Sequence, residues 1–370
     1  MTAWLRERID IRTACQGREG ICLCGSSGEV WNWRPGSGAM FTAQACHLNG
    51  TVCIILLIHT WRCAMPWLMI WMLLGPSVVS VVIAVIAWRV IRRGARPVQI
   101  GRRSSGAVVA GAATVMAVYP VLDAAPLWID APSPAWSTIF DTRFVLPLVL
   151  GLLVLMILGA VRPRPSSRSE AVLSPRSWRS FLNTWWLGAV LGVLALIIGL
   201  TLSAGMASQP NDAGQYSLYV VDLGSAAFGT AIYGWHHSLI PSVLCVLLSA
   251  TTWWTLSRIA RPPLPPTHAA DAADRRLRST NALRVMLGAL LLHLEAILHS
   301  LASTSRMTGS FSGGGDLFFS TGTPFSALSG TLSVLAQIAG ILGLALWAFT
   351  ALTAVRTRAT TRSSRTAVPT

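Results

Sequence analysis

The chain contains no lysine, so all 29 of its basic residues are arginine. Charged residues of either sign make up only 12% of the sequence, whereas 53% of the residues are hydrophobic. A single water-soluble core could not bury that much apolar surface. The composition therefore excludes an ordinary soluble domain and indicates a membrane protein. The exclusive use of arginine is typical of a GC-rich genome, which predicts a bacterial source.

The sequence also lacks the short motifs of the common enzyme classes. We find no phosphate-binding loop, no catalytic serine motif and no thiol redox pair. We therefore expect that the chain is not an enzyme, and the sequence assigns no cofactor to it. A net charge of +15 can indicate a nucleic-acid partner. Here the arginines are spread over short segments beside apolar runs instead of forming one basic face, so we expect no nucleic-acid binding.

Seven apolar runs follow one another over residues 65–355. They cover residues 67–91, 106–122, 144–161, 181–203, 237–257, 283–302 and 326–355. Each is close to the roughly 20 residues that a helix needs to cross a hydrocarbon layer about 30 Å thick. The sequence therefore predicts an all-α, polytopic transmembrane bundle of seven spans, with the lipid bilayer as its principal partner.

Arginines are concentrated on every second connection between these runs. They include Arg92, Arg93, Arg96, Arg102 and Arg103, then Arg162 to Arg179, Arg258 to Arg284, and Arg356 to Arg365. The alternate connections hold only Arg143 and Arg306, together with several aspartates. Arginine beside a span marks the cytoplasmic side. We thus expect a bacterial cytoplasmic membrane, an external N-terminus and a cytoplasmic C-terminus. The tail 356–370 is expected to be disordered, and the arginine loops to lie near anionic lipid headgroups.

Residues 1–64 differ from the rest of the chain and contain six of its seven cysteines. Two interpretations are open. The segment can be a small exported region whose cysteines oxidise outside the cytoplasm. Alternatively, translation begins at Met65, Met69 or Met72, and the upstream residues have no selected structure. We favour the second, because the segment shows no helical or strand periodicity and its cysteine spacings match no compact metal or disulfide pattern.

Two weaker patterns concern how the helices assemble. The pair Arg162-Pro163 recurs as Arg261-Pro262, 99 positions later, which suggests tandem helical hairpins unless it only reflects how common these residues are in short turns. Gly188 and Gly192 form a G-x-x-x-G pattern, and Ala336 with Gly340 has the same spacing. Small residues at this spacing let helices approach closely, either within the bundle, which we favour, or between two protomers or membrane partners.

Two expectations concern the membrane boundary. Tryptophans gather near the ends of the apolar runs, and Trp347 is one of those expected there. The largest external loop, 205–235, contains an apolar run from Tyr216 to Val221 that we expect to lie on the membrane surface.

The candidate functional residues lie mainly in the sixth run. Glu295 is the only acidic residue within the seven runs, and it lies 11 residues beyond Arg284, or about 16 Å along a helix. A carboxylate at this depth is costly, so it should face the interior, be protonated or have a partner. His299 is four residues on and shares its helix face, whereas His293 points elsewhere. His236 and His237 at the mouth of the fifth run can complete a cluster, because adjacent helices joined by a hairpin pack together.

Three functions are compatible with this cluster. The first is a transport-type or ion- and solute-sensing bundle in which Glu295 carries the proton or cation and histidines relay it. The second is a non-catalytic membrane scaffold or accessory subunit, in which Glu295 and His299 form only a structural pair. The third is a membrane-embedded enzyme with an outward-facing metal site formed by His237, Glu295 and His299, although their spacing is not that of a zinc protease.

Overall fold

The computed structural model describes residues 21–23, 30–32, 55–92, 102–124, 134–160, 184–222, 227–261, 268–312 and 318–366. The chain divides into two compact units, Met1–Cys63 and Ala64–Thr370. In the first unit, strand β1 (Ile21–Leu23) pairs antiparallel with strand β2 (Val30–Asn32). Most of residues 1–64 lie outside the described residues, so both interpretations of this segment stay predictions.

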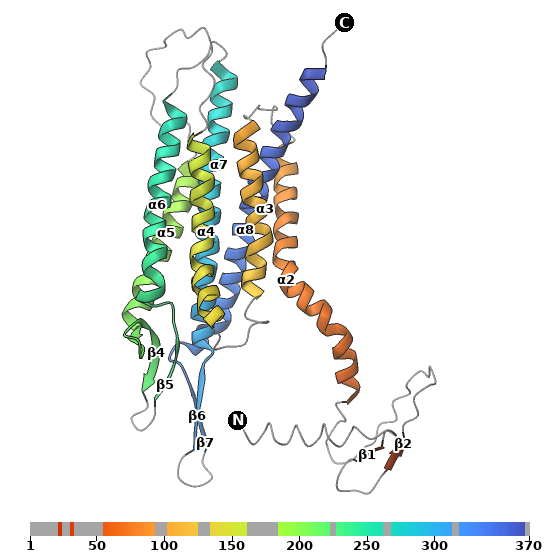
Figure 1. Ribbon diagram of the computed structural model, residues 1–370, viewed down its shortest axis with the longest axis vertical. Coiled ribbons are helices and arrows are strands. Elements are labelled where there is room, and N and C mark those ends of the chain that lie inside the picture. Colours follow the sequence, from red (N-terminus) through yellow and green to blue (C-terminus); the bar gives the residue numbers. More distant parts are fainter. Residues whose placement is uncertain are drawn as a thin grey trace. The chain divides into compact units, whose positions relative to one another are not determined.

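The second unit is mostly helical, and a helix covers each of the seven apolar runs (Figure 1). The helices are α2 (Ile55–Arg92), α3 (Arg102–Ala124), α4 (Pro134–Ala160), α5 (Thr184–Ala207), α6 (Trp235–Ala260), α7 (His268–Ser305) and α8 (Ser329–Thr366). Among the described residues, six of these helices contain a segment long and apolar enough to cross a membrane. The exception is α3, whose apolar stretch Val108–Leu122 is shorter. The expectation of seven full spans is therefore met by six candidates and one shorter apolar helix.

Two helices extend beyond the runs that predicted them. Helix α2 begins at Ile55, so the apolar residues just before the first predicted span belong to the same helix. Helix α8 continues to Thr366, and helical backbone thus includes most of the tail that we expected to be disordered. The arginine pairs that suggested tandem hairpins lie partly outside the described residues, so that pattern stays a prediction.

Helix α7 is the centre of the bundle. Over an 18-residue apolar stretch of its candidate span, 89% of the residues are buried, against 22% in the corresponding stretches of α2 and α5. It packs against α4, α5, α6 and α8, and its leucines and alanines form much of the hydrophobic core. Trp347 of α8 is also fully buried there, so its ring lies inside the bundle, while its expected position near the membrane boundary stays a prediction. Because α7 is enclosed, a polar side chain on it must find its partners inside the protein.

Close helix contacts use glycines other than those of the G-x-x-x-G pattern. A Cβ atom added at Gly343 would lie 2.9 Å from the Cγ of Leu292, and one added at Gly288 would lie 2.9 Å from the Cδ1 of Trp347. Added Cβ atoms at Gly188 and Gly192 would meet nothing within 4 Å. The expected internal packing therefore occurs between α7 and α8, and not at the α5 pattern.

The segments after α5 and α7 form small antiparallel sheets, which is a departure from an all-α fold. Strands β3 (Gln209–Pro210), β4 (Tyr216–Asp222) and β5 (Ala227–Ala231) form one sheet in that order, and β6 (Thr308–Ser312) pairs with β7 (Phe318–Gly322). The apolar run from Tyr216 to Val221 thus lies in strand β4, paired with β5, while its expected place on the membrane surface stays a prediction. The β5 end is tied to α7, since the Thr304 hydroxyl donates to the carbonyl of Ala231 at 3.0 Å.

The two ends of this unit differ in composition. The strands lie at one end, which we call the strand end (Figure 1). The opposite end holds the C-terminal ends of α2, α4, α6 and α8 and the N-terminal ends of α3, α5 and α7 (Figure 1). Arg92, Arg102, Arg258, Arg261 and Arg275 belong to that opposite end, which we call the arginine end.

Candidate functional site

Glu295 lies where three helices of the bundle meet. It is on α7, and its side chain is hydrogen-bonded to the hydroxyl of Tyr119 on α3. A Cβ atom added at Gly340 of α8 would lie 3.1 Å from the Cγ of Glu295, which is a tight contact, so the glycine lets α8 approach this side chain without displacing it. Glu295 is 6% exposed and Tyr119 is also 6% exposed. The sequence-based expectation that this residue faces the bundle interior with a partner agrees with this placement.

The partner of Glu295 is not the one expected from helix spacing. We predicted a Glu295–His299 pair, because residues four apart share a helix face. The structure places His299 in an exposed position near the end of α7, and the hydrogen bond of Glu295 goes to Tyr119 instead. Spacing along one helix gives the direction of a side chain, but it does not show which neighbouring helix offers a closer partner.

The hydrogen bonds around Tyr119 depend on where the protons are. The Tyr119 oxygen lies 3.0 Å from the backbone carbonyl of Leu292, which can only accept a proton. A hydroxyl has a single proton, so when Tyr119 donates it to Leu292, the carboxyl of Glu295 must donate to Tyr119. Both contacts therefore form together only when Glu295 is protonated. An ionised Glu295 would accept the hydrogen bond from the Tyr119 hydroxyl, and the Leu292 carbonyl would then have no hydrogen bond from Tyr119.

His293 is buried on a different face of α7. It is 1% exposed, and its Nδ1 lies 2.9 Å from the backbone carbonyl of Phe144 on α4. Since a carbonyl only accepts, Nδ1 carries the proton, and in the neutral ring Nε2 is then an acceptor for the Tyr233 hydroxyl, 3.5 Å away. Burial raises the pKa of Tyr233, so its hydroxyl stays protonated and remains a donor. His293 thus links α7 to α4 and to Tyr233, two residues after the end of β5.

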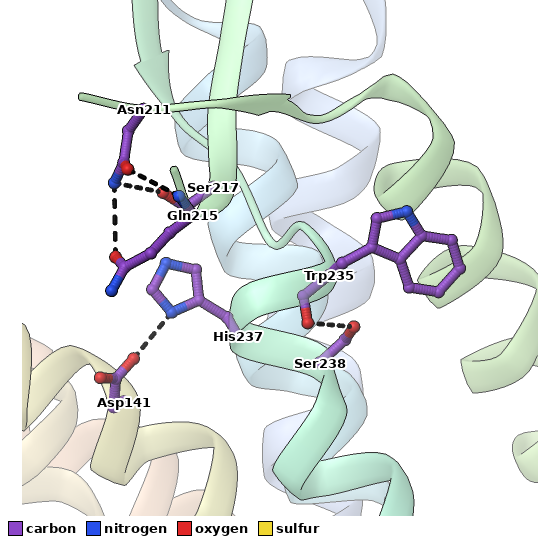
Figure 2. Close-up of polar contacts among 7 residues, drawn as sticks. All are labelled: Asp141, Asn211, Gln215, Ser217, Trp235, His237 and Ser238. Carbon is purple, nitrogen blue, oxygen red and sulfur yellow. Dashed lines mark hydrogen bonds and ion pairs between the residues drawn. The ribbon is translucent and has the colours of Figure 1, made fainter. Parts of the chain in front are cut away.

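His236 and His237 meet Asp141, and not Glu295, at the strand end. The Nδ1 of His237 lies 2.7 Å from Oδ1 of Asp141, as Figure 2 shows. The rings of His236 and His237 have their centroids 5.0 Å apart. One ligand atom from each of these three side chains lies within 4.8 Å of the other two, so the group has the composition of a metal site. The predicted five-residue cluster is therefore divided over separate places in the structure.

An aromatic pair separates the Asp141 cluster from buried His293. The ring of Phe144 lies 4.7 Å from that of Tyr233, 6.3 Å from His237 and 6.5 Å from His293, measured between centroids. Phe144 is 1% exposed and Tyr233 is fully buried. Phe144 thus places an apolar ring beside both His237 and His293.

Three residues of these groups were missed as site residues. Asp141 is one of the several aspartates of the alternate connections, and neither it nor Tyr119 nor Tyr233 was singled out from the sequence. A signal existed for Asp141, because a carboxylate three residues before Phe144 opens the apolar run of α4. Nothing in the local sequence pairs Tyr119 with a residue 176 positions away.

Comparisons with protein-family models, with curated proteins and with solved structures gave no match at a significant level. The functional argument therefore depends on the side chains alone.

Proposed function

We propose that this protein is a multi-pass membrane protein of the transport or sensing type, in which Glu295 and Tyr119 bind and release a proton inside the bundle. The observation that supports the proposal is the buried contact between these two side chains where α3, α7 and α8 meet. Ionisable groups inside a membrane bundle are costly, and they commonly mark proton or ion pathways.

Protonation of Glu295 changes how α3 is held against α7. With the proton present, Glu295 donates to Tyr119 and Tyr119 donates to the Leu292 carbonyl. When the proton leaves, Tyr119 turns its hydrogen to the carboxylate, and its bond to Leu292 is lost. The loss of one proton from Glu295 thus removes one of the hydrogen bonds between α3 and α7. A difference of this kind between two states lets a proton bias a conformational equilibrium, which transport and sensing both need.

The location and threading follow from the arginine end. We propose that α3 completes a seven-span bundle with the six longer helices, in the cytoplasmic membrane of a bacterium. The arginine end faces the cytoplasm, together with the C-terminus, while the N-terminus and the strand end face outward. Support comes from the position of arginine-bearing helix ends on one side of the unit (Figure 1).

The replacement Glu295→Gln tests the proton step. A glutamine amide can still donate to Tyr119, so it imitates the protonated state in shape and hydrogen bonding but cannot release a proton. We expect the variant to insert and fold normally in lipid vesicles. Proton uptake driven by a potassium diffusion potential, followed with a pH-sensitive dye inside the vesicles, should fall to the level of vesicles without protein. Tyr119→Phe should lower the uptake rate while retaining part of it.

A control variant separates this effect from general damage. Gln337 is a polar residue of α8 that is exposed on the bundle surface, so Gln337→Ala should leave proton uptake unchanged. If Glu295→Gln takes up protons as fast as the natural protein and differs only in thermal stability, the carboxyl is structural. That result would overturn the proposal and favour a scaffold or accessory subunit.

A further inference from the structure

We propose that Asp141, His236 and His237 bind a divalent transition-metal ion, with Zn²⁺ as the reference ion, at the strand end of the bundle. The three side chains come from two helices that pack against each other, α4 and α6. They offer one carboxylate oxygen and two imidazole nitrogens, and these atoms already lie within 4.8 Å of one another.

The spacing of these atoms is close to what a metal ion needs. Zinc binds nitrogen and oxygen ligands at about 2.0–2.2 Å, so two ligands of a tetrahedral site are about 3.3–3.6 Å apart. The Asp141 oxygen and the His237 nitrogen are 2.7 Å apart, joined by a hydrogen bond. Rotations of the three side chains would lengthen the distance between the Asp141 oxygen and the His237 nitrogen and shorten the distances from these atoms to His236.

The donor set selects the class of metal. Imidazole nitrogens favour Zn²⁺, Cu²⁺ and Ni²⁺, whereas Ca²⁺ and Mg²⁺ prefer sites built from oxygen alone. Two histidines and one carboxylate are a common three-ligand set for zinc, in which the fourth position is left to water or another ligand. Neither Glu295 nor His299 belongs to this set, so it differs from the metal site that the sequence suggested.

The neighbouring side chains hold His237 in position before an ion arrives. Its side chain is 13% exposed, and its ring lies against Phe144 with 6.3 Å between centroids. Asp141 is 50% exposed at its side chain, and His236 is exposed as well. An ion can therefore reach the cluster through the exposed Asp141 and His236, while the ring of His237 is largely buried beside Phe144.

Zinc binding by the full-length protein tests this site. The six cysteines before Ala64 would bind zinc themselves, so the purified protein in detergent is first treated with a chelator and then with N-ethylmaleimide. Isothermal titration with ZnCl₂ should then show a site that weakens at least about tenfold in His236→Ala and in Asp141→Asn. With CoCl₂, the visible absorption of bound cobalt should appear in the natural protein and be lost in the same variants.

The matched control is His299→Ala, which removes another exposed histidine outside the cluster. It should bind zinc and cobalt like the natural protein. Because His236 is exposed, its replacement should not disturb folding, and circular dichroism checks this for each variant. Equal zinc affinity in His236→Ala, Asp141→Asn and His299→Ala would overturn the proposal. This test uses no proton flux, so its result is independent of the role proposed for Glu295.

Discussion

Phe144 of α4 contacts polar residues of α6, of α7 and of the segment before α6 through its ring and its backbone carbonyl. Its carbonyl accepts the hydrogen bond from His293, and its ring contacts Tyr233 and His237. A phenylalanine buried among three elements contributes both apolar burial and aromatic contacts. Its removal would leave a cavity between the Asp141 cluster and the bundle core.

We expect Phe144→Ala to lower the free energy of unfolding by about 3–5 kcal/mol, because a buried ring is replaced by a cavity. Chemical unfolding in detergent micelles, followed by circular dichroism, measures the change. Phe144→Leu should cost less, since it refills part of the volume. Met206→Ala is the control, because Met206 is 80% exposed and its loss should change stability by no more than about 0.5 kcal/mol. Equal losses in Phe144→Ala and Met206→Ala would show that the ring is not a packing centre.

At this scale the sequence predicts where polar groups are costly, but not what they bind. Glu295 can be identified from the sequence because it is a carboxylate within an apolar run, and the structure shows that it is buried. Its partner Tyr119 cannot be found in this way, because the contact joins residues 176 positions apart on helices whose arrangement the sequence does not specify. His237 is a similar case, since Asp141 comes from another helix.

At the scale of elements, the contact between α7 and α8 depends on two facing glycines. A Cβ atom added at Gly343 would lie 2.9 Å from the Cγ of Leu292 and 3.2 Å from the carbonyl oxygen of Gly288. The contact with Gly288 is with a backbone atom, which cannot move away by a change of rotamer as a side chain can. The two helices can therefore approach this closely only without a side chain at these positions.

We expect Gly343→Ala to destabilise the protein by about 1–3 kcal/mol, since the added methyl group overpacks the α7–α8 contact. Gly188→Ala is the matched control, because nothing lies within 4 Å of its added Cβ. That variant should be neutral or more stable by up to about 1 kcal/mol, given the higher helix propensity of alanine. Thermal unfolding of both variants in the same detergent compares them. A loss in Gly188→Ala as large as in Gly343→Ala would mean that α5 makes a close contact with another copy or partner.

Pattern alone predicted the helices well and the segments between them poorly. The seven apolar runs all became helices, because apolar length is a property of each segment by itself. The sheet after α5 was missed, although a turn signal was present. The Asn211 side chain accepts bonds from the backbone amides of Ala213 and Gln215, and Gly214 takes a positive φ of 74°, which together reverse the chain before β4. The apolar residues of β4 favoured a segment on the membrane surface instead of a strand.

At the scale of the whole second unit, the alternation of arginines and the direction of the helices agree. Successive helices run in opposite directions, so helix C-termini and N-termini alternate between the strand end and the arginine end (Figure 1). The positions of the arginines in the sequence do not depend on helix packing, and they mark the same end of the unit as the helix directions do. The number of candidate spans among the described residues is six and not the expected seven, because the apolar stretch of α3 is shorter than the others.

The threading can be tested by placing one epitope after Asp222, at the end of β4, and another after Arg168, in the segment between α4 and α5. We expect an antibody to bind the first epitope in intact spheroplasts and the second only after the membrane is permeabilised, because arginine-rich connections are retained in the cytoplasm. Immunofluorescence before and after permeabilisation measures this, and a cytoplasmic marker protein controls for leakage. If both epitopes react in the same compartment, α5 does not cross the membrane. Glu295 would then no longer lie between two compartments, since α7 belongs to the same bundle as α5, and the proposed proton path through it would fail.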